Sequence, residues 1–143
     1  LQDPQTMGYA LTDSPMGTAA WIWERRRNWS DCDGDIEKAF EKEHLCTTAA
    51  LFWCTKSINS SLRLYHEHFK KDWPMVDDRM PVLKAPTGLA VFPKDVVHLP
   101  KKVLERYCNL HHYAVLSKGG HFGPAEAPAE LVDEIRKFFV PLI

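Results

Sequence analysis

The sequence lacks an apolar run that could cross a bilayer, because its longest apolar stretches fall far short of the about 20 residues that a spanning helix needs. It also lacks an excess of one charge: 18 Lys and Arg stand against 19 Asp and Glu, a formal net charge of −1. Such a balance provides no strong field for nucleic acid or an anionic membrane. We therefore expect no nucleic-acid partner and no membrane segment in this chain.

Cysteine is scarce, and no CxxC motif occurs among Cys32, Cys46, Cys54 and Cys108. Two of the four, Cys46 and Cys54, are eight residues apart on a predicted helix, too far to bond to each other. We expect free thiols that fill apolar space, which is consistent with a reducing compartment. No histidine has zinc-site spacing with a partner, so we expect no metal.

The acidic run Asp31-Cys32-Asp33-Gly34-Asp35 has the composition of a calcium loop but not its spacing. Its glycine falls at the fourth position instead of the sixth, and the twelfth position is Lys42 instead of a glutamate. The spacing therefore predicts a polar loop.

The 143 residues suffice for one domain with its own core, and 45% of them are hydrophobic. Because the chain begins with Leu1, we expect it to start inside a longer protein. Residues 1–80 read as mostly helical: one helix begins at Asp13-Ser14-Pro15, and others span about 43–56 and 59–70. The last has Asn59 or Ser60 as a possible cap.

An apolar stripe follows the helix at 59–70, through Ile58, Leu62, Tyr65 and Phe69. This spacing predicts that Tyr65 faces inward with its hydroxyl. A buried tyrosine usually just finds a hydrogen-bond partner, so the stripe alone gives it no catalytic role.

From residue 81 the pattern changes to strand, helix, strand, helix. We expect strands at 89–92 and 113–117, a short helix after Pro100, and a closing helix after Pro128. The closing helix places apolar residues on one face: Leu131, Ile135, Phe138 and Phe139. This order is typical of a parallel sheet in an α/β fold.

Asp95 follows the first predicted strand, and His121 follows the second across the turn Gly119-Gly120. Because the carboxyl ends of parallel strands share one sheet edge, the two side chains are predicted to lie within hydrogen-bond reach. Their order matches the acid and histidine of a hydrolase triad. The plainer alternatives are a simple glycine turn and an aspartate that caps a helix.

Five stretches, in order along nearly the whole chain, resemble the microsomal-type epoxide hydrolases, a family of the α/β-hydrolase superfamily that includes the juvenile-hormone epoxide hydrolases. They are Gln5–Gly17, Ala19–Ile22, Ser60–Tyr65, Pro86–Asp95 and Gly119–Phe122. The resemblance implies the C-terminal portion of an α/β-hydrolase fold, with residues 1–80 as a helical lid segment and 81–143 as the last βα units. Such a portion is incomplete without an N-terminal half.

The resemblance implies hydrolysis of a small hydrophobic epoxide to a vicinal diol through a covalent ester. His121 would be the general base, Asp95 would orient it, and Tyr65 would donate a proton to the epoxide oxygen. No metal or organic cofactor is expected. Localisation stays open between the cytoplasm and a membrane reached through an upstream anchor.

The chain departs from the family at its nucleophile: it has no Gly-x-Asp-x-Gly or Gly-x-Ser-x-Gly elbow. The oxyanion loop and the second lid tyrosine, which would lie just before Leu1, are absent as well. We therefore expect the N-terminal half, on the same or a separate chain, as a partner, and no activity from this segment alone. An ester or haloalkane hydrolase of the same fold, or a non-catalytic small-molecule-binding protein, remains the alternative.

Overall fold

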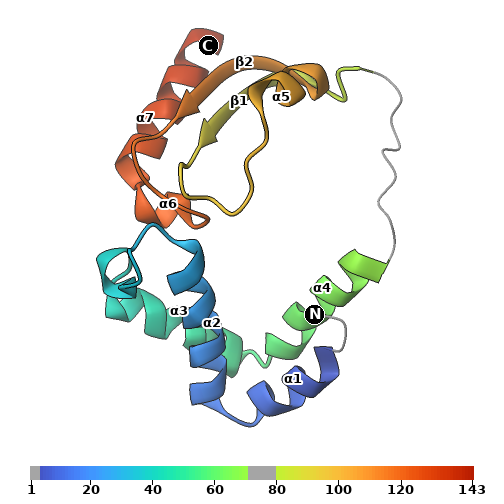
Figure 1. Cartoon of the computed structure of the whole chain (residues 1–143), viewed down its shortest axis with the longest axis vertical. Coiled ribbons are helices and arrows are strands. Elements are labelled where there is room, and N and C mark those ends of the chain that lie inside the picture. The colour runs from blue at the N-terminus through green and yellow to red at the C-terminus, as the bar shows by residue number, and fades with distance from the viewer. Residues whose placement is uncertain (1–3, 71–79) are drawn as a thin grey trace. The chain divides into compact units, whose positions relative to one another are not determined.

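The computed structural model describes residues 4–70 and 80–143, without the side chain of Phe69 (Figure 1). The described residues form two units. The first unit holds residues 4–28 and 34–70, and the second holds 29–33 and 80–143. The predicted boundary between 80 and 81 adjoins residues 71–79, which lie outside the described residues.

The first unit is helical, as its sequence predicts. Its elements are α1 (Pro4–Thr12), α2 (Pro15–Trp29), which ends in the second unit, the 3-10 helix η1 (Ile36–Lys38), α3 (Lys42–Cys54) and α4 (Ile58–Lys70). The helix start at Ser14-Pro15 is confirmed, because the Ser14 hydroxyl accepts the backbone N–H of Gly17 at 3.0 Å. Proline at the first helical position loses no hydrogen bond there.

The core of this unit lies between α1 and α4. Leu11, Ile58 and Leu62 are buried together, and partly buried Met7, Trp21 and Phe52 pack against them. The fully buried Thr18 hydroxyl donates to the Leu11 carbonyl at 2.7 Å. That bond satisfies one of the carbonyls that the last turn of a helix leaves unpaired.

Two expectations for α4 are wrong. The helix begins at Ile58, and the Ser57 carbonyl accepts the N–H of Ser61, so Asn59 and Ser60 lie inside the helix and do not cap it. Tyr65 is 47% exposed instead of facing inward, because contact with α1 buries Ile58 and Leu62 and leaves the next turn open. The expected burial of Phe69 falls on a side chain outside the described residues.

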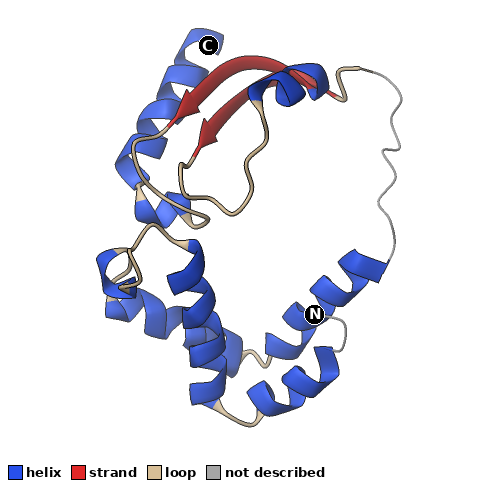
Figure 2. Cartoon of the chain, in the orientation of Figure 1, coloured by secondary structure: helices blue, strands red, loops and turns tan. Residues whose placement is uncertain are grey.

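The second unit has the predicted strand–helix–strand–helix order (Figure 2). Its elements are β1 (Leu83–Val91), α5 (Lys101–Tyr107), β2 (Cys108–Val115), α6 (Gly123–Glu126), α7 (Pro128–Phe139) and the 3-10 helix η2 (Val140–Leu142). The two strands are parallel, with Leu89 opposite Tyr113 and Val91 opposite Val115. The predicted alternation of parallel strands with helices is therefore confirmed, although both strands begin several residues earlier than predicted.

Helix α7 packs against both strands. Gly88 permits the approach, since a Cβ there would lie 2.8 Å from the Phe138 ring. The His112 ring bonds the Glu134 carboxylate at 2.7 Å beside this contact. Ile135 and Phe139, on the predicted apolar face of α7, are still 45% and 52% exposed, so the sheet covers that face only in part.

The cysteines divide into two kinds. Cys32 and Cys108 are buried free thiols, as predicted, whereas Cys46 and Cys54 are exposed, because they point away from the side of α3 that buries Leu45 and Ala49. No helix within residues 4–70 and 80–143 has the length and apolar character of a membrane span.

Candidate active site

Asp95 and His121 lie just beyond the ends of β1 and β2, where the parallel pairing continues into the loops. The backbone N–H of Leu116 donates to Val91 at 2.9 Å, and that of Lys94 donates to Gly119 at 3.0 Å. A bridge between Lys94 and Gly120 extends the ladder to the residues adjoining the two side chains. The sheet edge itself thus brings the carboxylate and the imidazole side by side.

The predicted hydrogen-bond reach between these side chains is confirmed: His121 Nδ1 lies 2.9 Å from Asp95 Oδ1. The same oxygen accepts the backbone N–H of Val96 at 2.7 Å, which fixes the carboxylate against its own loop. The imidazole side chain is 41% exposed and the carboxylate 29%, so solvent reaches the ring. A carboxylate that binds Nδ1–H leaves Nε2 as the basic ring nitrogen.

The pKa of Asp95 is held below its ordinary value of 3.8. Partial burial on its own would raise this pKa, but the hydrogen bonds from His121 and from the backbone N–H of Val96 outweigh the burial. Asp95 is therefore an anion at neutral pH, the form that orients an imidazole and stabilises an imidazolium.

The two glycines before His121 are needed for different reasons. Gly119 has a φ of +105°, a conformation that L side chains rarely adopt. Gly120 lies against backbone: a Cβ there would be 2.5 Å from the Trp29 carbonyl oxygen and 3.0 Å from the Asp31 nitrogen. The turn therefore depends on the residues around Trp29 as well as on its own sequence.

No family model matches the chain. Individual relatives do: epoxide hydrolase 1 of Sus scrofa is 38% identical over 142 residues, and juvenile hormone epoxide hydrolase 2 of Ctenocephalides felis is 32% identical over 140 residues. These matches cover 94% and 92% of the chain. Over nearly its whole length, the chain resembles part of these epoxide hydrolases. It spans about a third of these relatives, 31% and 30% of their lengths.

Solved epoxide hydrolases show that the likeness extends to the fold. The crystal structure of juvenile hormone epoxide hydrolase from the silkworm Bombyx mori matches 96% of this chain and 37% of its own, with a TM-score of 0.81 and 29% identity. The chain therefore has the fold of a C-terminal portion of an α/β-hydrolase. The comparisons do not favour the ester hydrolase, haloalkane hydrolase or binding-protein alternatives.

The third residue implied by the resemblance to epoxide hydrolases, Tyr65, lies on α4 in the first unit. Its 47% exposure leaves the phenol accessible to a ligand. Asp95 and His121 both belong to the second unit, where the sheet edge pairs them.

Two groups of residues beside His121 escaped the sequence reasoning. The first is the segment Trp29–Asp33, predicted only as a polar loop, which belongs to the second unit. The second is Glu126 of α6, whose carboxylate accepts backbone N–H groups on both sides of His121. Asp31 could not be found from a local pattern, because it is 88 residues from its partner Gly119.

No cluster of three or more histidine, cysteine, aspartate or glutamate side chains with the arrangement of a metal site occurs in the part of the chain that the structure describes. An imidazole held by a carboxylate, as His121 is by Asp95, is an arrangement that can transfer protons.

Proposed function

We propose that the complete enzyme containing this chain hydrolyses small hydrophobic epoxides to vicinal diols. The observation that carries the proposal is the 2.9 Å hydrogen bond between Asp95 and His121 at the sheet edge of an epoxide hydrolase fold. It supplies an oriented general base. The family likeness supplies the reaction to which such a base contributes.

The reaction has two chemical steps. An aspartate carboxylate from the N-terminal half attacks one epoxide carbon, the carbon–oxygen bond breaks, and the departing oxygen takes the proton of the Tyr65 phenol. A covalent ester of the substrate remains on the enzyme. Ring opening without a proton donor would leave an alkoxide, so an accessible phenol is the suitable group for this step.

His121 serves the second step. Its Nε2 takes a proton from water while the water oxygen attacks the ester carbonyl carbon. The tetrahedral intermediate then collapses as the ester C–O bond breaks, and the leaving oxygen takes the proton of the new carboxyl group, so that the diol leaves and the nucleophilic carboxylate is restored. The imidazolium returns its proton to the Tyr65 phenolate, which completes the cycle. The ionised Asp95 stabilises the imidazolium that forms, which lowers the cost of the proton transfer.

The N-terminal half is the proposed partner, on the same or a separate chain. The sheet described here has two parallel strands, and parallel sheets are buried on both faces in stable proteins. Val115 on β2 is 61% exposed and Val97 beyond β1 is 65% exposed. Such apolar surface is what additional sheet and helix layers would cover.

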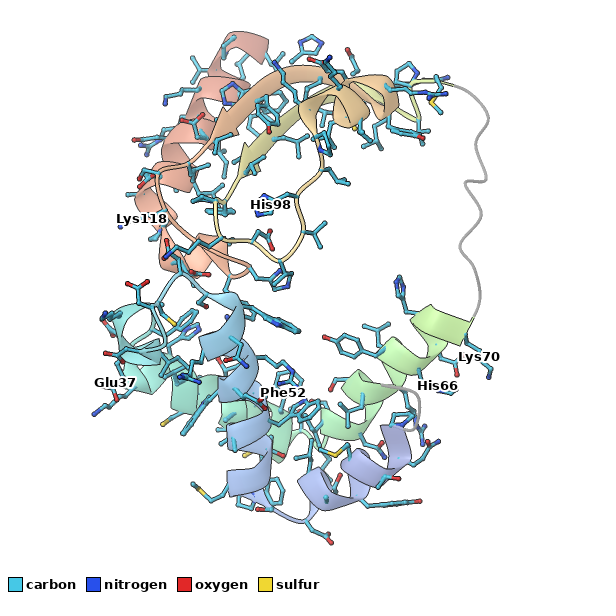
Figure 3. The ribbon with its side chains drawn as sticks, viewed as in Figure 1. Glu37, Phe52, His66, Lys70, His98 and Lys118 are labelled. Carbon is cyan, nitrogen blue, oxygen red and sulfur yellow. The ribbon has the colours of Figure 1, made fainter. Side chains whose placement is uncertain are left out.

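The substitution His121→Gln in the complete enzyme separates the two steps. Glutamine cannot take a proton from water at neutral pH, so the ester should form and then persist. Intact-protein mass spectrometry should show the mass of one substrate molecule added. His98→Gln, the same change in the loop between β1 and α5, is the matched control and should turn over normally (Figure 3). Normal diol formation by the His121 variant would overturn the proposed role.

Tyr65→Phe should have the opposite effect. It keeps the ring and removes the proton donor, so formation of the ester should slow while its decay is unchanged. The loss is partial if the second tyrosine also donates. Tyr9→Phe, which changes a 71% exposed tyrosine on α1, serves as the control. Ester formation at the parent rate in the Tyr65 variant would remove Tyr65 from the mechanism.

A further inference from the structure

The segment Trp29–Asp33 joins the loop that carries His121. The Trp29 carbonyl accepts the backbone N–H of His121 itself at 2.8 Å, and the indole meets the imidazole edge to face at 5.3 Å. One oxygen of the Asp31 carboxylate, Oδ2, accepts the N–H of Gly119 at 3.0 Å. The backbone on both sides of Gly120 is therefore held by this short upstream segment.

The same segment also holds the loop that carries Asp95. The other Asp31 oxygen, Oδ1, lies 2.6 Å from the Lys94 ammonium, and Asp33 lies 3.3 Å from the same ammonium. Lys94 is the direct neighbour of Asp95. One carboxylate, Asp31, thus bonds both loops, one with each oxygen.

The charge of Asp31 is maintained by these contacts. The Lys94 ammonium and the Gly119 N–H hold the pKa of Asp31 below its ordinary value of 3.8. The side chain is only 18% exposed, so its bonds are poorly screened by water. Asp31 is an anion throughout the neutral range and can accept from both partners at once.

Glu126 completes the arrangement from the other side of His121. Its Oε2 accepts the N–H groups of Asp31 at 2.6 Å and Gly120 at 2.9 Å. Its Oε1 accepts the N–H of Phe122 at 2.9 Å. The residues immediately before and after His121 therefore donate to one carboxylate, which also bonds the backbone of Asp31.

We propose that Asp31 and Glu126 are positioning residues that hold the His121 loop and the Asp95 loop at the separation required for ester hydrolysis. The proposal rests on the proposed function. Neither carboxylate touches the reacting atoms; both act through the backbone that carries the base. A base displaced by about 1 Å can lose about 100-fold in rate, so the expected effect falls on the step that uses His121.

The test uses Asp31→Asn and Glu126→Gln in the complete enzyme, with a simple epoxide such as styrene oxide. Each amide keeps one acceptor oxygen and turns an NH2 group toward an N–H or ammonium donor, so at least one bond to a catalytic loop is lost. The matched controls are Asp133→Asn on α7 and Glu105→Gln on α5, both of which change exposed carboxylates. Lys94→Met removes the ion pairs of Lys94 with Asp31 and Asp33, leaves the bond between Asp31 and Gly119 in place, and should also slow ester decay.

The measured quantity is the decay rate of the covalent ester, counted only on molecules that have been alkylated. Unfolded molecules do not alkylate, so partial unfolding does not lower this rate. We expect decay to slow about 10- to 100-fold in the Asp31 and Glu126 variants, with alkylation changed less than about 3-fold. The controls should match the parent in both steps.

The outcomes separate the two proposals. Parent-like ester decay in both variants overturns the positioning role and leaves the proposed function standing. Equal loss of alkylation and decay, or no alkylation at all, also overturns it, because a positioning residue for His121 spares the first step. A parent protein that forms neither ester nor diol overturns the proposed function, and the positioning role with it.

Discussion

Adding one methyl group at Gly120 should lower the stability of the second unit and slow the hydrolysis of the ester by His121. The Cβ of Gly120→Ala would lie 2.5 Å from the Trp29 carbonyl oxygen, and 3.0 Å from both the Asp31 nitrogen and the Ser30 Cα. Carbon atoms in favourable contact are about 3.5–4.0 Å apart, so the two backbones must separate by up to about 1 Å. The obstructing atoms are backbone, which cannot move aside as a side-chain end can.

This separation breaks bonds whose cost can be summed. The His121 N–H to Trp29 bond at 2.8 Å is neutral and contributes about 0.5–1.5 kcal/mol. The Gly120 N–H to Glu126 bond at 2.9 Å has a charged acceptor and contributes about 1.5–3 kcal/mol. We expect the free energy of unfolding to fall by about 2–4.5 kcal/mol. A displacement of the imidazole by up to about 1 Å should slow ester decay by up to about 100-fold.

Urea unfolding and ester decay measure the two effects separately in the complete enzyme. Gly17→Ala is the control: its Cβ would lie 3.2 Å from the Ser14 side chain, and alanine favours the helix that contains it. We expect the control to change stability by less than about 1 kcal/mol. If Gly120→Ala unfolds at the parent urea concentration and hydrolyses its ester at the parent rate, the close approach of Gly120 to Trp29 is not present in the protein.

Three more predictions follow from the same structure. Leu62→Ala, at a side chain only 1% exposed, should lower the free energy of unfolding by about 2–5 kcal/mol in urea, whereas Leu64→Ala, 71% exposed, should change it by less than about 0.5 kcal/mol. Asp31 and Asp95 have folded pKa values below 3.8, so the stability that they contribute is complete above that pH and is lost as the pH falls through the folded pKa. The free energy of unfolding, measured over a pH series, should therefore depend less on pH in acid for Asp31→Asn than for the parent. The isolated 143-residue chain should form no diol and should elute as associated species in size-exclusion chromatography. If this chain alone formed diol, and His121→Ala abolished that activity, a separate nucleophile would not be needed.

The pairing of Asp95 with His121 could be predicted because its geometry follows from strand order. Asp95 and His121 each come after a strand, and parallel strands bring their carboxyl ends to one edge whatever the detailed register. Helix periodicity likewise placed α3, α4 and α7 within a few residues. These features depend on nearby residues or on a general rule of topology.

The starts of the strands could not be predicted in the same way. The part of β1 before residue 89 contains Lys84, Pro86 and Gly88, which have low strand propensity, and its exposed residues carry no alternating pattern. Its conformation comes from pairing with β2, a partner more than 20 residues away. Tyr65 was misplaced for a related reason: a helix stripe indicates which side chains share a face, but the neighbouring helix decides how many of them it covers.

Residues 29–33 belong to the second unit although the segments on both sides of them in the sequence belong to the first. This division determines which segments can be exchanged between relatives. Exchanging the continuous block 1–80 between relatives would replace Asp31 and leave its partners Lys94 and Gly119 in place. The exchangeable piece is instead discontinuous, with 29–33 retained alongside residues 80–143. Chimaeras that respect this division should keep the contacts that hold the His121 loop. A single crossover near residue 80 would instead combine the Asp95 and His121 loops with residues 29–33 of another protein.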